Sequence, residues 1–451
     1  MTRRCGVLTH KMLSRGNGPG AYRRSDPAPR SVCAVTVISR NPIIRYFLLT
    51  FPTSFKTGFI LVLTHREEVH LALNVKCRDN IRKQPVQRLT MTTQEHFRKV
   101  DSDMLDEIHV YAGTAGHSAW FSEDQGLTWS HPNSHSGMYL EARVWCFGSH
   151  AELHDTLVAG TDEGVFRWSE RTARWECIST QIKDVWSIAY DARDPSTLYA
   201  GTRPAGLYRS RDGGETWSEL TVPGIAKFSE VNMGPTRVTQ LLADPLVPDT
   251  LWATIEIGGI YRSTDGGSSW CALSNGLNSG DVHGIAVSRT ARGERRILAT
   301  TNRGLHISDD GGETWRFAEL ESPWQYTRAV VTRTDDPSVV FLANGNGPPG
   351  NDGRLLRSLD GGETWERLTL PGSINSTVWC IATHFSNPDL IFVCTNLGQL
   401  FRSTNGGDSW TRLPHEFGEI RSLHWRAVPK GTRGALHSLT RAVAPKLVAA
   451  T

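Results

Sequence analysis

Four acidic residues fall at predicted strand starts or in predicted loops on one side of the chain's repeated units. Hydrolysis of a glycosidic bond uses two carboxyl groups about 5–9.5 Å apart, one protonating the leaving oxygen and the other acting as base or nucleophile. The acids that this chemistry could use are Asp184, Asp281, Glu256 and Glu141. We therefore consider a hydrolytic pair among them as one hypothesis.

Arginine, aromatic and histidine side chains occupy similar predicted places. An arginine guanidinium binds a carboxylate through two parallel hydrogen bonds, and aromatic platforms flanked by arginines suit sugars or anionic peptides. The candidate ligand-binding residues are Arg143, Trp145, Trp186, Arg203, Arg237, His283, Arg328, Trp379 and Arg421. The alternative is that strand starts are solvated and accept any side chain.

The sequence gives little support for a metal site or a reactive cysteine. The eight cysteines contain no CxxC pair, and the turns lack the acid spacing of an EF-hand. His117, His131 and His135 could approach one another as metal ligands, but surface histidines without a metal are the simpler reading. Cys146 and Cys380 each follow a Val-Trp pair and are expected to be buried thiols. We expect no metal, no cofactor and a reduced, cytoplasmic-type protein.

A short phrase, Ser-x-Asp-x-Gly-x-Thr-Trp in its best copies, recurs along the chain. Its terminal tryptophans lie at positions 129, 175, 217, 270, 315, 365 and 410, with the copy ending at Trp175 decayed. Each unit of about 45 residues contains four short apolar runs rich in β-branched and aromatic residues, which predict four antiparallel strands. In the third unit these runs are 185–190, 197–201, 206–209 and 216–220.

Seven such sheets predict an all-β fold, a seven-bladed β-propeller of four-stranded antiparallel blades. An isolated sheet of this size leaves two apolar faces uncovered, and radial packing covers both. The first unit has its second strand (108–113), third (118–122) and fourth (128 onward) but lacks its first. Residues 419–425 match the first-strand pattern, so the C-terminal strand is expected to complete the first blade and close the ring.

The repeated phrase is itself a turn between the third and fourth strands. Its Asp can accept backbone N–H groups, its Gly permits φ > 0, its Thr or Ser hydroxyl can bond locally, and its Trp pins the turn to the blade. Equivalent side chains spread around a rim do not converge on a substrate, so their role is structural. These residues are Asp124, Asp212, Asp265, Asp310, Asp360 and Asn405.

The opposite face of the ring should hold any ligand site. The first residues of the inner strands align as Arg143, Asp184, Arg237, Asp281, Tyr326, Thr377 and Glu419. Two residues further on stand Trp145, Trp186, Thr239, His283, Arg328, Trp379 and Arg421. The expanded loop 344–352 could overhang the channel mouth, and long loops in compact domains are often functional.

The phrase resembles the Asp-box, or bacterial neuraminidase repeat, of sialidases, sortilin-type receptors, some xyloglucan hydrolases and photosystem assembly factors. The resemblance covers residues 107–427 and implies the propeller fold. Sialidases use three arginines, a Tyr–Glu nucleophile pair and an Asp acid/base, which would correspond here to Arg237, Arg328 and Arg421, to Tyr326 with Glu256, and to Asp281. The early Phe-Arg-Ile-Pro motif of sialidases is missing, and sialidases have six blades. Xyloglucan hydrolases of this type place their site between two propellers, whereas this chain has length for one.

Charge divides the chain of 451 residues into two parts. Residues 1–90 hold 16 Lys+Arg against 4 Asp+Glu, a net charge of +12, and residues 91–451 hold 33 against 42, a net charge of −9. The acidic body gives no electrostatic reason to expect nucleic acid. We expect a basic appendage (1–104) that is a disordered arm, a transit-like segment or upstream sequence, a propeller (105–427) and a flexible basic tail (428–451). The uncharged apolar runs are about ten residues, too short to span a membrane.

Three functions remain open from sequence alone. The leading expectation is a monomeric propeller that binds a glycan, peptide or protein at the channel mouth without a catalytic constellation. The alternative is a glycoside hydrolase, with Asp184, Asp281, Glu256 and Tyr326 as candidate catalytic residues. The third is an assembly or scaffold factor with a basic patch for a protein partner.

Overall fold

The computed structural model describes residues 107–133 and 135–429. Of the preceding chain it describes the backbone of five short strands, β1 (Ala34–Asn41), β2 (Ile44–Thr50), β3 (Phe59–Ile60), β4 (Val62–His65) and β5 (Glu68–Leu71). These belong to a unit of their own, Met1–Met104, and the repeats belong to Leu105–Thr451. The rest of the predicted appendage, and the predicted tail after Pro429, lie outside the described residues. No helix in the described part of the chain is long and apolar enough to cross a membrane.

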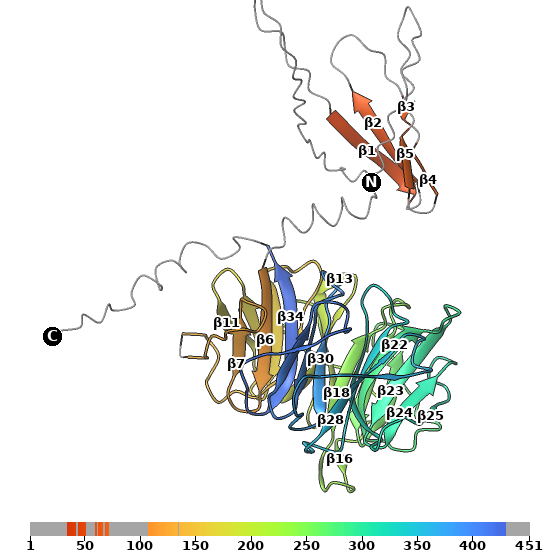
Figure 1. The fold of residues 1–451 in the computed structure, drawn as a ribbon. Coiled ribbons are helices and arrows are strands. Elements are labelled where there is room, and N and C mark those ends of the chain that lie inside the picture. Colours follow the sequence, from red (N-terminus) through yellow and green to blue (C-terminus); the bar gives the residue numbers. More distant parts are fainter. Residues whose placement is uncertain are drawn as a thin grey trace, which may run out of the picture. The chain divides into compact units, whose positions relative to one another are not determined.

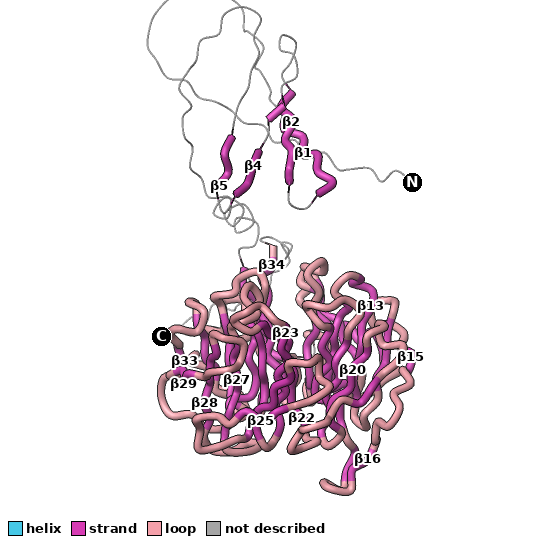
Figure 2. Tube along the Cα trace, turned by 90° about the vertical axis from the view of Figure 1, so that its right-hand side faces the viewer, coloured by secondary structure: helices cyan, strands magenta, loops and turns pink. Residues whose placement is uncertain are grey.

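The repeats form a seven-bladed β-propeller, as predicted (Figures 1 and 2). From blade 1 to blade 7 the inner strands are β34 (Ile420–Val428), β8 (Val144–Gly148), β12 (Val185–Asp191), β18 (Arg237–Ala243), β22 (Val282–Arg289), β26 (Tyr326–Thr332) and β30 (Val378–Ala382). The second strands, in the same order, are β6 (Glu107–Thr114), β9 (Thr156–Thr161), β13 (Asp194–Thr202), β19 (Leu251–Glu256), β23 (Arg295–Thr301), β27 (Val340–Gly345) and β31 (Ile391–Thr395).

The two outer positions of each blade hold shorter strands. The third strands are β7 (Ala119–Ser122), β10 (Val165–Ser169), β14 (Leu207–Ser210), β20 (Gly259–Ser263), β24 (Gly304–Ser308), β28 (Gly353–Ser358) and β32 (Leu400–Ser403). The fourth strands of blades 2 to 7 are β11 (Arg174–Ser179), β15 (Ser218–Glu219), β21 (Cys271–Ala272), β25 (Arg316–Ala318), β29 (Glu366–Leu368) and β33 (Thr411–Arg412). A small hairpin, β16 (Phe228–Ser229) and β17 (Gly234–Pro235), connects blades 3 and 4 and projects from the ring (Figure 1).

The hydrophobic core lies between the blades. The described residues contain seven clusters of buried apolar side chains, and each cluster joins two neighbouring blades. Alternate residues of a middle strand point to opposite neighbours, so Leu157 packs toward blade 1 while Val158 packs toward blade 3. The apolar faces of each thin sheet are therefore covered by its two neighbours.

Blade 1 is built from both ends of the described propeller, as the sequence predicted. Strand β34 pairs antiparallel with β6, with Ile420 opposite Thr114 and Val428 opposite Glu107, and the two strands lie side by side in Figure 1. Trp425 of β34 is fully buried and packs with Phe392 of blade 7 and Val110 of β6. This strand joins the first and last blades.

The turns of the repeated phrase have the geometry that the sequence suggested. In the turn of blade 5, the Ser308 hydroxyl donates to Asp310 (2.8 Å) and accepts from the Gly312 amide (2.8 Å). The Asp310 carboxylate also accepts from the Thr314 amide (3.0 Å) and hydroxyl (2.6 Å). Blade 7 repeats the pattern with Asn405 in place of Asp.

Two blades depart from the pattern. The predicted fourth strand of blade 1 is reduced to one bridge between Phe121 and Ser130, because Pro132 soon follows and cannot donate to a ladder. Blade 2, where the phrase is decayed, has a buried glutamate instead of the turn aspartate. Glu170 accepts hydrogen bonds from Tyr111 and lies 2.9 Å from Nδ1 of His109, both on β6. A tie to the neighbouring blade thus replaces the local turn.

We expect Trp425→Ala to destabilise the propeller by about 3–5 kcal/mol, the usual cost of removing a buried aromatic side chain. Truncation before Ile420 should be more severe, because it leaves β6 with an open edge and uncovers blade 7. Urea unfolding measures the first variant and soluble yield the second. Truncation after Pro429 is the control and should leave the unfolding midpoint unchanged; equal damage from both truncations would contradict the closure role of β34.

A second prediction concerns acid stability. Hydrogen bonds from Thr314 and Ser308 lower the pKa of Asp310 to about 2 from its ordinary value of 3.8. A depressed pKa stabilises the folded state above the unfolded-state value, and this contribution disappears as pH falls from about 4 to about 2. The Asp310→Asn variant should therefore fold, because blade 7 already has Asn405 at the equivalent position. Between roughly pH 5 and roughly pH 3 its free energy of unfolding should decrease less than that of the parent. Urea midpoints at both pH values measure this, with the exposed Glu152→Gln as control.

Candidate functional site

The inner strands begin on one face of the propeller, and their first and third residues surround the channel there. We call these residues the mouth ring. Backbone bonds link them to the loop between the second and third strands: Arg203 N donates to Asp184 O (2.9 Å), Asn302 N to Asp281 O (3.2 Å) and Asn396 N to Thr377 O (3.0 Å). The predicted loops and strand starts therefore share one face.

Indole and guanidinium groups contact one another in sequence around the mouth ring. The Trp145 and Trp186 rings stack with centroids 4.1 Å apart, and the Arg237 guanidinium lies 4.2 Å from the Trp186 centroid. On the other side, Arg421 lies 5.9 Å from Trp145 and 5.4 Å from Trp379. Arg328 then lies 3.8 Å from Trp379. These contacts connect six of the predicted ligand-binding residues in one continuous series.

This series of side-chain contacts changes the role expected for the tryptophans. Trp186 is covered by Trp145 on one side and contacted by Arg237, and Trp379 is contacted by two arginines and is 7% exposed. A sugar platform requires a free aromatic face, and cation–π contacts occupy these faces instead. The tryptophans position the arginines, a coupling that sequence alignment of single strands does not reveal.

The three arginines repel one another. Burial lowers the pKa of Arg237, and the charges of Arg328 and Arg421 add to the decrease. Burial and the charge of Arg328 also lower the pKa of Arg421. Glu256 forms an ion pair with Arg237 and Glu419 forms one with Arg421. Arg328 makes no such pair within the described residues, so its guanidinium is available for an anionic or hydroxyl-bearing ligand.

Asp281 is a half-buried acid beside these arginines. Burial opposes its ionisation, but His283 and the charges of Arg328 and Arg237 together lower its pKa. Burial and Arg328 lower the pKa of His283, whose Nδ1 lies 2.6 Å from the carbonyl oxygen of Thr327. A carbonyl only accepts, so the neutral ring is protonated on Nδ1, and its Nε2, 3.4 Å from Asp281 Oδ1, carries a proton toward the carboxylate only when the ring takes up a second proton. Asp281 Oδ1 is buried without a hydrogen-bond donor.

Tyr326 and Glu256, which the sialidase resemblance implied as a nucleophile pair, each lie within reach of an arginine. Burial raises the pKa of Tyr326, and its hydroxyl lies 3.4 Å from an Arg328 nitrogen. Glu256 receives a 2.6 Å hydrogen bond from Arg237. A glutamate held by an arginine is a poor base for a phenol, so the contact with Arg237 weighs against this pair.

Asp184 belongs to a second group of mouth residues. Burial raises its pKa, opposed by the hydrogen bond from Trp145 Nε1 (3.3 Å) and the charge of Arg203. Its backbone has a φ of +44°, a conformation that Asp tolerates better than most residues. Arg203, Arg143 and Glu141 are exposed.

Two acids outside the predicted site, Glu419 and Asp162, also contact its residues. Glu419 pairs with Arg421, and Asp162 accepts from the Tyr139 hydroxyl and the Arg143 amide (3.1 Å). The signal for Glu419 was available: residues i and i+2 of a strand share a face, as in the contact between Asp281 and His283. The Tyr139 contact spans two loops and has no such signal.

The histidines and cysteines behave as ordinary side chains. In the described residues, no three His, Cys, Asp or Glu side chains are grouped to hold a metal ion. His117, His131 and His135 are all exposed, and the His131 ring packs on Trp120 with centroids 4.5 Å apart. Burial raises the pKa of the Cys146 thiol to about 12, and the Cys380 thiol donates to the Arg421 carbonyl (3.4 Å).

Comparison with known proteins identifies the repeat and several relatives. A family model described as BNR/Asp-box repeat matches residues 208–219 and 306–317. A probable oligoxyloglucan-reducing end-specific xyloglucanase of Neosartorya fischeri is 23% identical over 218 residues, covering 44% of this chain and 25% of the relative. Xyloglucanase Xgh74A of Acetivibrio thermocellus is 28% identical over 215 residues, covering 40% and 25%. The chain thus spans about a quarter of the length of these xyloglucanases.

These matches correct the leading functional expectation. A propeller that only binds its ligand was expected first, and that expectation was wrong, because several of the curated relatives are xyloglucanases. The glycoside hydrolase alternative is better supported. If the chain is an enzyme, glycoside hydrolase is the class that its relatives indicate.

One relative is matched over a larger share of its own length. The photosystem II assembly lipoprotein Ycf48 of Synechococcus sp. (strain CC9902) is 30% identical over 265 residues, covering 47% of this chain and 68% of the relative. Among solved structures, YCF48 bound to D1 peptide has a TM-score of 0.48 at 21% identity, covering 67% of this chain and 91% of that chain. The GH74 enzyme of Niastella koreensis has a TM-score of 0.47 at 22% identity, covering 60% and 45%. The chain is an Asp-box β-propeller and belongs to the family of Ycf48.

Proposed function

We propose that this propeller is a glycoside hydrolase whose substrate binds at the mouth ring. Asp281 acts as the base and Asp184 as the acid. The xyloglucanase relatives support a glycan substrate, and xyloglucan oligosaccharides are the first substrates to test.

The observation that carries this proposal is the environment of Asp281. Its Oδ1 is buried and has no donor, while its lowered pKa keeps it ionised at neutral pH. An ionised oxygen without a donor is costly in a buried place unless a ligand or water supplies the proton. A water molecule or substrate hydroxyl at this position would satisfy it.

Asp184 supplies the complementary property. Its raised pKa favours the protonated form that an acid needs, and two carboxyl groups with opposite shifts are the usual arrangement for acid and base roles. In the proposed step, Asp281 takes a proton from water as the water oxygen bonds to the anomeric carbon. The glycosidic bond breaks, and Asp184 gives its proton to the leaving oxygen. Arg328 holds a substrate hydroxyl or carboxylate beside this centre.

A second candidate function is that of an assembly factor. The relationship to Ycf48 supports it, and Arg328 could receive the carboxylate of a protein segment. Two results together would favour this candidate over the enzyme. An acidic peptide would bind with micromolar affinity and lose that affinity in the Arg328→Ala variant, and the protein would show no hydrolytic activity.

Replacing either acid by its amide should abolish most activity. We expect Asp281→Asn and Asp184→Asn each to lower kcat/KM on a cleaved glycoside by about 10²–10⁴-fold, the usual contribution of acid–base catalysis. Circular dichroism should show an unchanged fold. Glu141→Gln, an exposed acid on the same side, is the matched control. Activity that persists in both amide variants, or an absence of turnover on any of a panel of xyloglucan oligosaccharides and chromogenic glycosides, would contradict the proposal.

The pH profile offers an independent test of Asp184. The acid must be protonated, so activity should fall as pH rises through its pKa. Arg203 is a charge that lowers this pKa, so Arg203→Gln should move the descending limb to higher pH. The exposed Arg211→Gln, in the turn of blade 3, should leave the limb in place. A descending limb that does not respond to Arg203 would show that another group donates the proton.

A further inference from the structure

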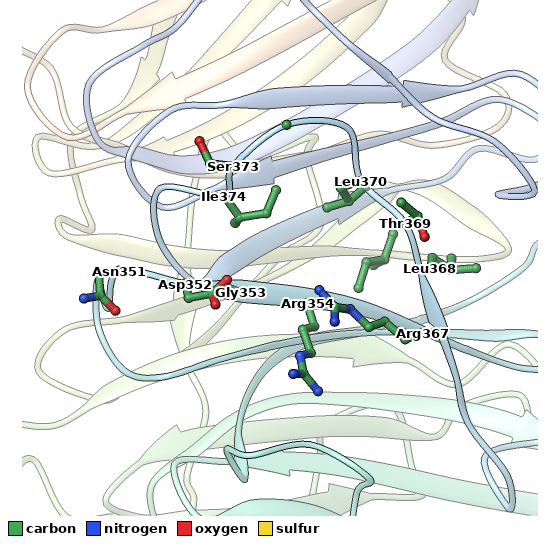
Figure 3. A pocket seen from close by; sticks show the side chains of 12 residues that line it. Asn351, Asp352, Gly353, Arg354, Arg367, Leu368, Thr369, Leu370, Ser373 and Ile374 are labelled. Atoms are coloured by element: carbon green, nitrogen blue, oxygen red, sulfur yellow. The ribbon is translucent and has the colours of Figure 1, made fainter.

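A separate pocket lies on blade 6, away from the mouth-ring acids. It has a volume of about 330 Å³, within the size range of small-molecule sites. Its walls come from β28, the end of β29, the loop 344–352 and the connection 369–374 (Figure 3). It forms where β29 ends at Leu368, which leaves the beginning of β28 without an outer neighbour.

Two arginines line this pocket. Arg367 is paired in register with Leu356, and Arg354 is two residues from Leu356, so both arginines are on one face of the β28–β29 pair. Diagonal neighbours in this arrangement are about 7–8 Å apart at Cα, within reach of one bridging anion. Figure 3 shows both guanidinium groups on the same side of the pocket. Neither forms an ion pair with a carboxylate in the described residues.

The Arg354 side chain is held in place. Its guanidinium carbon lies 5.2 Å from the Trp324 ring centroid, a cation–π contact that orients it before any ligand arrives. Arg357, the next arginine on β28, differs because it pairs with Glu366 and Asp408. Arg354 and Arg367 therefore have guanidinium groups free for an external anion.

The remaining walls suit a hydroxyl-bearing ligand. The Asp352 carboxylate caps the Gly353 amide (2.7 Å) and keeps an oxygen for a ligand hydroxyl. Ile374 and Leu370 give an apolar side, with Ser373 beside them (Figure 3).

The loop that forms one side of the pocket is fixed internally. Asn346 Oδ1 accepts from the amides of Asn351 (2.9 Å) and Asp352 (3.2 Å). Thr377 anchors the same loop through its amide to Pro349 O (2.8 Å) and its hydroxyl to Gly347 O (2.5 Å). The loop predicted to overhang the channel mouth thus covers the first position of blade 7 and also builds the pocket.

We propose that this pocket binds a sugar unit bearing a carboxylate, such as a uronic acid, with Arg354 and Arg367 on the carboxylate and Asp352 on a hydroxyl. The site is distinct from the mouth ring. It would operate whether or not the mouth ring hydrolyses glycans, because it requires no turnover.

Calorimetric titration of the full chain with a digalacturonate and with a neutral disaccharide of the same size tests the proposal. We expect the acidic disaccharide to bind at least tenfold more tightly, and added salt to weaken it. The double variant Arg354→Gln/Arg367→Gln should lose at least tenfold in affinity. The double control Arg211→Gln/Arg292→Gln removes the same charge from exposed positions elsewhere and should bind normally.

Other results would overturn the proposal. Equal binding of neutral and acidic disaccharides would remove the carboxylate requirement. Inorganic phosphate that binds as tightly as digalacturonate would indicate a general anion site rather than a sugar site. Equal losses in both double variants would indicate non-specific charge attraction. Circular dichroism of each variant separates unfolding from lost binding, and Asp352→Asn should weaken the sugar without affecting phosphate.

Discussion

Mutual burial between neighbouring blades is the constraint on which the rest of the structure depends. Each blade is a thin sheet that cannot cover its own apolar faces, and the seven clusters between blades supply most of the described core. A gap in the ring would expose two of these faces at once. The Asp-box turns stabilise the outer hairpins. Hydrogen bonds to one Asp or Asn hold each turn, and a tryptophan such as Trp365 donates to a glycine carbonyl of the same turn. The candidate site residues therefore lie at strand ends and in loops, since the middle of each sheet is covered by its neighbours.

Side chains at the channel mouth also cover one another. Its tryptophans face other tryptophans and arginines, so that four blades share one chain of indole and guanidinium groups from Arg237 to Arg421. Two of the three arginines are balanced by glutamates, and this leaves Arg328 and Asp281 as a pair of opposite charges with unfilled hydrogen-bonding capacity. Chemistry at this face therefore rests on few atoms, and the neighbouring side chains position those atoms.

Repetition made the fold predictable from sequence, since seven copies of one phrase fix both the number of blades and the turn chemistry. Strand β34 could be recognised because residues 419–425 repeat the pattern of the other inner strands. The site was less accessible. Spacing placed Asp281, Tyr326 and Arg328 on the mouth, yet it could not show that Glu256 is held by Arg237 or that the face of Trp186 is covered, because these contacts join different blades. The pocket on blade 6 depends on where β29 ends and how Asn346 folds its loop, which strand patterns do not encode.

The pairing of β34 with β6 has a consequence for how the chain is made. Trp425 meets Val110 across 315 positions of sequence, so the first blade stays incomplete until nearly all of the propeller has left the ribosome. Contacts of such long range are slow to form, and an unpaired strand edge invites association with other chains meanwhile. Synthesis thus leaves the nascent propeller open for most of its elongation, and a chaperone that shields β6 during that interval would protect it from aggregation.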